Sequence, residues 1–196
     1  MILLAALVLG VAVGLGWASL HGRRYEAPDL KSVWLVFVAF LPQVIILYFP
    51  KARAQVSDSL AGILLIGSQV LLLVFAWLNR KLPGMWVLFL GALLNFIVTA
   101  ANGGFMPISP QTASRLVPQD VLADIPTGAR FGVKDILLPP EATRFELLAD
   151  RFLPPAWSPY QVAFSLGDVL IAFGVFWLLG IQKTYTFGLT TKRTTS

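Results

Sequence analysis

Five long apolar runs alternate with polar links along this chain and define its expected architecture. The runs cover residues 1–20, 33–50, 59–79, 85–102 and 166–182. Each approaches the roughly 20 residues with which a helix crosses the hydrocarbon core of a bilayer at about 1.5 Å per residue. The pattern therefore predicts an all-α, polytopic membrane protein with five transmembrane helices.

A long polar stretch, residues 103–162, separates the fourth apolar run from the fifth. It contains nine of the 13 prolines and is too long for a simple connection between helices. Its segment 141–153 places Phe145, Leu148 and Phe152 on one helical face, next to pairs of prolines. We therefore expect a Pro-rich extracytoplasmic loop containing an amphipathic helix that lies on the outer surface or packs over the transmembrane helices.

These runs divide the chain into four expected parts. They are a four-helix transmembrane part (1–102), the extracytoplasmic loop (103–162), a fifth transmembrane helix (163–182) and a flexible cytoplasmic tail (183–196). If the N-terminus lies outside, the inner links and the tail hold eight Lys and Arg, whereas the one short outer link holds two. Inner segments of membrane proteins carry such an excess of basic residues. We therefore expect the N-terminus outside and the C-terminus inside.

The composition agrees with a membrane protein and argues against an enzyme. Apolar residues make up 57% of the 196 positions and charged residues 13%, against about 25% charged in soluble domains. The net charge of +5 is spread over the links, so we expect the lipid bilayer as a partner and no nucleic acid. The chain has no cysteine, and His21 is its one histidine, which excludes thiolate metal sites and bis-histidine haem. We find no hydrolase or phosphate-loop motif, and we expect no catalytic residue, metal or cofactor.

Asp168 is the one ionisable side chain inside an apolar run. A charge is costly within a membrane, so such a residue is a functional candidate by default. Ser165 precedes it by three positions, however, in the Ser-x-x-acid pattern of a capping box, where both side chains accept hydrogen bonds from amides at a helix start. Three roles remain open for Asp168: a structural cap, a contact to a ligand or partner, and proton transfer.

Three amide side chains lie deep within apolar runs. Gln43, Gln69 and Asn95 are each about ten residues from a run's end, which places them at a similar depth of about 15 Å. This spacing predicts a polar layer at the membrane midplane. The layer either joins helices through hydrogen bonds or lines a pocket for a headgroup, a quinone carbonyl or a small solute.

The fourth run ends on Asn102, Gly103 and Gly104, which tolerate the left-handed conformation that terminates helices. The simple interpretation is a helix stop followed by a tight loop. Alternatively, free glycine amides contact a ligand there, with Asn102 and Asp168 beside it. These residues are able to lie together because the fourth helix ends and the fifth begins on the same side of the membrane. The candidate contacts for a ligand or partner are Asn95, Asn102, Gly103, Gly104 and Asp168.

Four blocks of this chain resemble a family of small bacterial membrane proteins known only as a domain of unknown function. The blocks are MILLAALVLGVAVGLGW, NRKLPGM, LLNFIVTAANGGFMPIS and FSLGDVLIAFG, of which the NGGFMP and SLGD portions are the most specific. The resemblance spans nearly the whole chain. It implies helical membrane architecture and the bacterial cytoplasmic (inner) membrane, and it supplies no catalytic residues.

A non-enzymatic accessory or assembly subunit of a larger membrane complex is the function that these features favour. Gly10 and Gly14 form a GxxxG motif, which lets a neighbouring helix approach closely. Few intramembrane charges and the lack of an inverted repeat suit packing against other membrane subunits better than transport. Two alternatives use Asp168 and the midplane amides: a small transporter or channel, and a membrane protein that binds a lipid or a quinone.

Overall fold

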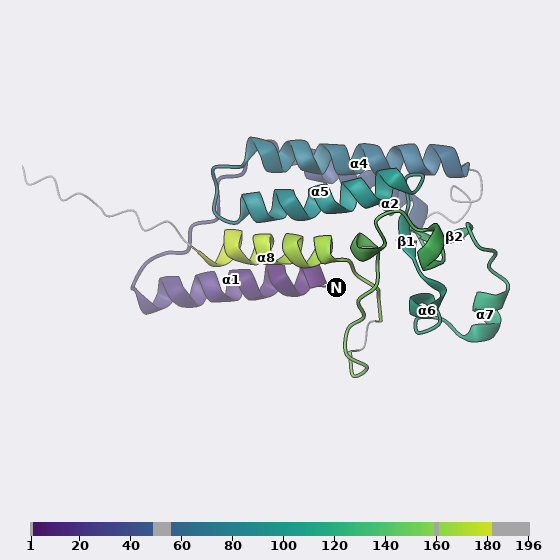
Figure 1. Ribbon diagram of the computed structural model, residues 1–196. Helices are drawn as coiled ribbons and strands as arrows, with labels where there is room; N and C mark the ends of the chain where they lie inside the picture. Colours follow the sequence, from purple (N-terminus) through teal and green to yellow (C-terminus); the bar gives the residue numbers. More distant parts are fainter. Residues whose placement is uncertain (1, 49–55, 159–160, 182–196) are drawn as a thin grey trace, which may run out of the picture.

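A computed structural model describes residues 2–48, 56–158 and 161–181 of the chain (Figure 1). Helices form over all five apolar runs: α1 (Ile2–Leu20), α2 (Trp34–Tyr48), α4 (Asp58–Leu78), α5 (Met85–Ala101) and α8 (Leu166–Gly180). By length and composition α1 and α4 are able to cross a membrane, whereas the apolar helices α5 and α8 are 17 and 15 residues long. The structure is thus mostly helical with two candidate membrane spans. The predicted tail, residues 183–196, lies outside the described residues.

The long helices lie side by side in a row. The order across the row is α1, α8, α5, α4 and α2, so that α1 and α2 stand at its two ends. Figure 1 shows α4, α5, α8 and α1 stacked in this order, with α2 behind α4 and α5. Helices α1, α8, α5 and α4 therefore form an open layer, α2 lies against one face of it beside α4, and α1 and α2 are not neighbours.

Small residues bring α8 close to both of its neighbours. A Cβ atom added at Gly10 of α1 would stand 3.0 Å from Leu179 Cβ of α8. One added at Gly91 of α5 would stand 2.5 Å from the Gly167 carbonyl oxygen of α8. The GxxxG motif of α1 therefore packs within this chain, because glycine allows the two backbones to approach. The buried residues of α1 are Ala6, Gly10, Gly14 and Ala18.

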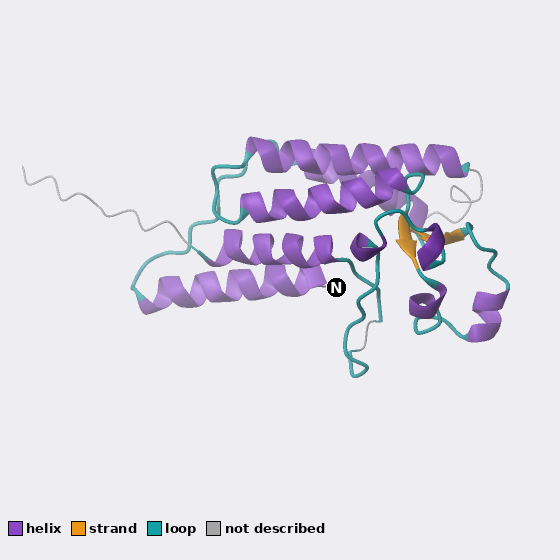
Figure 2. Ribbon diagram, in the orientation of Figure 1, coloured by secondary structure: helices purple, strands orange, loops and turns teal. Residues whose placement is uncertain are grey.

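The predicted outer loop folds into a small unit with a sheet, shown in orange in Figure 2. We call its described residues, 103–158, the outer domain after their predicted position. Its strands are β1 (Met106–Ile108), β2 (Arg130–Phe131) and β3 (Asp135–Leu137). They lie in the order β1-β3-β2, with β1 parallel and β2 antiparallel to β3. The prediction of an all-α fold was therefore wrong in this part. Strands of two or three residues leave no periodic pattern, and they form here because distant segments pair.

A local apolar core supports this sheet. Two short helices, α6 (Pro110–Ala113) and α7 (Gln119–Ala123), connect β1 to β2. The Ser109 hydroxyl caps α6 by accepting a hydrogen bond from the Thr112 amide at 3.2 Å. The buried residues of the core are Ile108, Ala113, Phe131, Leu137 and Ala163.

The amphipathic helix predicted over residues 141–153 does not form. Two 3₁₀ turns, η1 (Pro140–Ala142) and η2 (Glu146–Leu148), occupy this segment. Phe145 between them has a φ of 58°, in the left-handed region that a right-handed helix cannot include. The Asp150 amide donates a hydrogen bond to a carbonyl of β1 at 3.0 Å. The helix prediction was wrong because this long-range pairing holds the backbone of the segment in an irregular conformation. Its apolar side chains are retained, but its backbone does not form helical hydrogen bonds.

The two ends of the row differ in character. The outer domain lies at the end where α1 and α8 begin and where α5 stops (Figure 1). The opposite end contains the turn between α4 and α5 and the C-terminal ends of α1 and α8. Asn79 fastens the link before α2 to this second end, because its side chain accepts from the Lys31 amide at 2.8 Å and donates to the Lys31 carbonyl at 3.0 Å.

Candidate functional site

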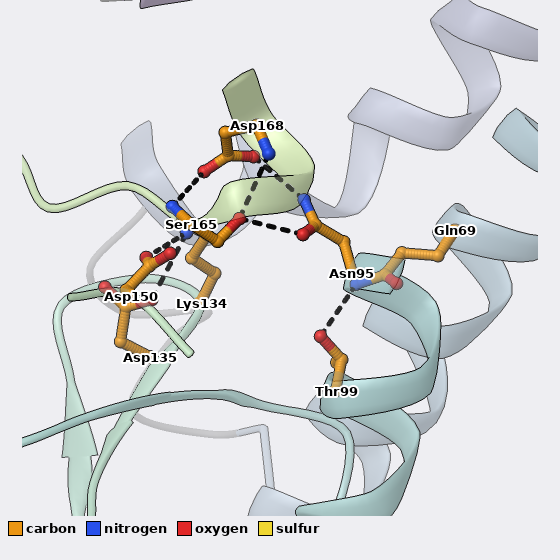
Figure 3. Close-up of polar contacts among 8 residues, drawn as sticks. All are labelled: Gln69, Asn95, Thr99, Lys134, Asp135, Asp150, Ser165 and Asp168. Atoms are coloured by element: carbon orange, nitrogen blue, oxygen red, sulfur yellow. Dashed lines mark hydrogen bonds and ion pairs between the residues drawn. The ribbon is translucent and has the colours of Figure 1, made fainter. Parts of the chain in front are cut away.

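Asn95, Ser165 and Asp168 form a ring of hydrogen bonds where α5 meets the first turn of α8 (Figure 3). Asn95 Nδ2 donates to Asp168 Oδ1 at 2.8 Å, and Ser165 Oγ donates to Asn95 Oδ1 at 2.8 Å. The Asp168 amide donates to Ser165 Oγ, and the Ser165 amide donates to Asp168 Oδ2, both at 3.1 Å. The predicted capping box is therefore confirmed, and Asn95 completes it from the neighbouring helix.

Gly167 makes this ring sterically feasible. A Cβ atom at position 167 would collide with Asn95 Oδ1 and stand 2.6 Å from Asn95 Cγ. Ser165 is fully buried, and both carboxylate oxygens of Asp168 accept a hydrogen bond. Buried polar groups are stable when they are paired in this way. The ring thus holds the start of α8 against α5 and accounts for Asp168 as a structural cap.

Lys134, Asp135 and Asp150 form a second polar group beside this ring, on the side of the outer domain (Figure 3). Lys134 precedes β3, and its Nζ atom lies 2.6 Å from Asp150 Oδ2 and 3.4 Å from Asp135 Oδ1. The side chain of Asp150 is 0% exposed and that of Lys134 is 38% exposed. Asp168 contributes to the charge environment of all three residues. One ammonium group therefore faces two carboxyl groups next to the start of α8.

The charge balance of this cluster determines how it titrates. Burial raises the pKa of Asp150 to about 7 against the opposing effect of Lys134, and burial also raises the pKa of Asp135. Burial lowers the pKa of Lys134, but the neighbouring carboxylates outweigh it and raise that pKa above its usual value. Asp150 Oδ1 is buried without a hydrogen-bond donor among the described groups, and Asp135 Oδ1 has the Lys134 ammonium group at 3.4 Å but no hydrogen bond. The two carboxyl groups therefore titrate as a coupled pair beside a Lys134 ammonium group that stays charged.

Asn102 joins the end of α5 to the outer domain. Its Oδ1 accepts from the Arg144 amide at 3.0 Å, and its Nδ2 donates to the Arg144 carbonyl at 2.9 Å. Gly103 and Gly104 have φ values of 74° and 93°, which confirms the predicted left-handed helix stop. The Gly104 amide donates to the Thr99 carbonyl at 2.9 Å. Both functional atoms of the Asn102 side chain and the Gly104 amide are therefore engaged within the protein.

The predicted midplane amides have separate surroundings. Gln69 Nε2 donates to Thr99 Oγ1 at 3.1 Å and so joins α4 to α5. Asn95, one helical turn before Thr99, bonds to the capping box of α8. The side chain of Gln43 lies outside the described part of the structure. Among the described side chains, therefore, α5 carries two polar contacts one turn apart, one directed to α4 and one to α8.

Lys134, Asp135 and Asp150 were not among the site residues predicted from the sequence. A signal existed for the first two, because Gly132 followed by the apolar pair Ile136 and Leu137 is typical of a turn leading into a short strand. Asp150 had no comparable signal, since only backbone pairing with β1 brings it to Lys134. The cluster is thus a product of tertiary structure.

The first polar group joins α5 to the start of α8, and the second joins β3 to the segment around Asp150 within the outer domain. They contain hydrogen bonds and an ion pair. Within residues 2–48, 56–158 and 161–181, no group of three or more His, Asp or Glu side chains is arranged to hold a metal ion. The geometry is that of structural contacts between segments of one chain.

Comparison with known proteins gives a family and one distant relative. A family of unknown function (DUF5317) matches residues 28–180. An uncharacterized protein of Thermotoga maritima is 33% identical over 109 residues, which are 55% of this chain and 56% of that protein. The chain thus spans about half the length of this curated relative. No solved structure matches the chain.

Proposed function

We propose a role for this chain, which belongs to the DUF5317 family of unknown function. The proposal rests on the hydrogen-bonded ring between α5 and the start of α8. The chain is a non-enzymatic protein of the bacterial cytoplasmic membrane that holds a fixed outer domain on a layer of membrane helices. In this role it is an accessory or assembly subunit that packs against other subunits of a larger membrane complex. Its five apolar helices cross the membrane with the N-terminus outside and the C-terminus inside.

The observation that carries this proposal is that the ring at the start of α8 is satisfied within the chain. Asn95, Ser165 and Asp168 use their hydrogen-bonding atoms on one another. A substrate site needs polar atoms that face an open space, whereas these atoms tie α5 to α8 directly beneath the outer domain. Such a junction transmits a fixed orientation from the membrane helices to the outer domain, which is what a subunit interface requires.

The open layer of helices supports the same role. The described helices do not close around a path for a solute, and the end helices α1 and α2 each have one main neighbour. Large apolar side chains are exposed along both end helices, among them Leu4, Val8 and Phe37. These faces suit contact with lipid or with the helices of another subunit. Alternating directions of the helices place the outer domain and the start of α1 at one end, in agreement with the expected orientation.

Native extraction followed by mass spectrometry tests the proposal. The wild-type chain should leave the membrane together with another membrane protein in a fixed ratio. Asn95→Leu, which breaks the ring, should reduce this co-purification, since the outer domain loses its fixed orientation. Ser68→Ala is a matched control, because the Ser68 hydroxyl bonds to the Leu64 carbonyl of its own helix. A chain that is recovered alone and that conducts a solute in liposomes would contradict the subunit role.

A further inference from the structure

A hollow lies at the end of the helix row opposite the outer domain, where α4 turns into α5 and where α8 ends. It has a volume of about 420 Å³, within the range of about 300–1,000 Å³ of small-molecule sites. Its lining includes the basic residues Arg80 and Lys81, the aromatic residues Trp86 and Trp177, and the aliphatic residue Ile181. The hollow thus combines two cations with aromatic and aliphatic walls at a helix-layer edge.

The two cations have no carboxylate partner in the part of the chain that the structure describes. Arg80 and Lys81 take part in none of the ion pairs found there, which involve Asp58, Asp135, Asp150 and Glu146. The Arg80 guanidinium carbon stands 4.6 Å from the centre of the Trp77 ring, and its Nη1 atom donates to the Trp77 carbonyl at 3.0 Å. These contacts fix the guanidinium group and leave other N–H groups to bind an anion.

The aromatic residues place this hollow at a membrane surface. Trp77 and Trp86 pack edge to face with ring centres 5.7 Å apart, and both are exposed. Tryptophan gathers where lipid headgroups meet the hydrocarbon core. Val87, which follows Trp86 in the first turn of α5, and Ile181, which caps the end of α8, add aliphatic side chains to the wall. A ligand that fits has a negative group for the cations and an apolar portion that follows the helices into the membrane.

We propose that this hollow binds the phosphate headgroup of an anionic phospholipid. Arg80 and Lys81 contact the phosphate, the tryptophan rings border the glycerol region, and an acyl chain passes Val87 along α5. Basic pockets between membrane helices bind anionic headgroups in this manner. The binding is independent of the proposed subunit role, because it concerns the opposite end of the helix row.

The test uses the full-length protein in nanodiscs that contain phosphatidylglycerol and phosphatidylcholine in equal amounts. Native mass spectrometry counts the lipids of each class that stay bound after the protein is released from the nanodisc. We expect the wild type to retain phosphatidylglycerol preferentially. Arg80→Gln with Lys81→Gln should lower this preference about 30-fold, because each interfacial cation contributes about a 5-fold preference for the anionic lipid and two are removed. Lys81→Gln alone changes an exposed side chain, so it folds regardless, and it should lower the preference about 5-fold.

Two controls separate this site from general charge effects. Arg23→Gln with Arg24→Gln removes the same charge from exposed positions just after the end of α1 and should leave the preference unchanged. Excess inorganic phosphate at matched ionic strength should not displace the lipid, since it lacks the apolar portion. The proposal is overturned if the wild type shows no preference, if the control pair loses as much as the hollow pair, or if phosphate alone displaces the lipid.

Discussion

Replacing Lys134 with methionine should destabilise the outer domain itself, because Lys134 joins the start of β3 to the segment around Asp150. The substitution keeps most of the aliphatic stem and removes the ammonium group that lies 2.6 Å from Asp150 Oδ2. Because Asp150 is 0% exposed, its carboxylate would lose a cation without gaining water. Removing one partner of a buried ion pair costs about 3–5 kcal/mol. Lys134 is itself 38% exposed, so we expect the lower end of that range, about 3 kcal/mol, at pH 8.

The cost should depend on pH with a definite sign. The native pKa of Asp150 is about 7 and its ordinary value is 3.8, so the folded state binds more protons between these values. The stability that this group contributes is therefore complete below about pH 4 and is lost as the pH rises through 7. In Lys134→Met the carboxyl pair lacks its cation and protonates more readily. The penalty of the substitution should consequently be smaller at pH 5 than at pH 8.

Hydrogen exchange of the β3 amides measures this effect in the folded protein. The Leu137 amide donates to the Ala129 carbonyl at 3.0 Å, and its exchange rate, corrected for intrinsic pH dependence, reports local opening. Asp150→Asn in the Lys134→Met background should restore part of the protection, because an amide removes the buried charge and donates to Asp135. The two substitutions should therefore be non-additive.

A matched control is the exposed pair Arg151–Glu146, whose Nη1 and Oε2 atoms lie 3.4 Å apart. Arg151→Met should change protection by about 1 kcal/mol or less, since surface ion pairs contribute little. Protection in Lys134→Met that equals the wild type at pH 8 would refute the reasoning. A penalty that grows as the pH falls from 8 to 5 would refute it as well.

Four further outcomes are expected. Asp168→Asn should cost little stability in detergent, because the Asn95 amide is able to flip and rebuild the ring, whereas Asp168→Ala should cost about 1–3 kcal/mol by leaving buried groups unpaired; equal loss of function in both, with normal folding, would show that the carboxylate does more than cap. Gly167→Ala should lower the melting temperature, because the added methyl collides with Asn95; an unchanged value would refute the close-packing argument. Gln69→Leu should lower thermal stability modestly and leave partner binding intact. A reporter fused after Ser196 should be active on the cytoplasmic side, and activity only outside would overturn the topology.

Local features of the sequence were sufficient for the helices and their ends. Apolar runs of sufficient length form helices in any membrane-like environment, because each residue bonds to a neighbour four positions away. The capping box of Ser165 and Asp168 and the left-handed stop at Gly103 involve residues within one turn, so their spacing determined them. The family assignment also followed from sequence blocks alone, and the family match confirms it.

Tertiary structure decided the features that join distant segments. Asn95 and Asp168 are 73 positions apart, and Lys134 and Asp150 are 16 apart. The segment 141–153 has a helical pattern of apolar residues, yet its backbone bonds to β1 and its Phe145 is left-handed. Such contacts depend on which helices become neighbours and on pairing energies that a local pattern does not contain. For that reason the sequence alone identified the cap on α8, while only the folded chain revealed the charged cluster of Lys134, Asp135 and Asp150 beside it.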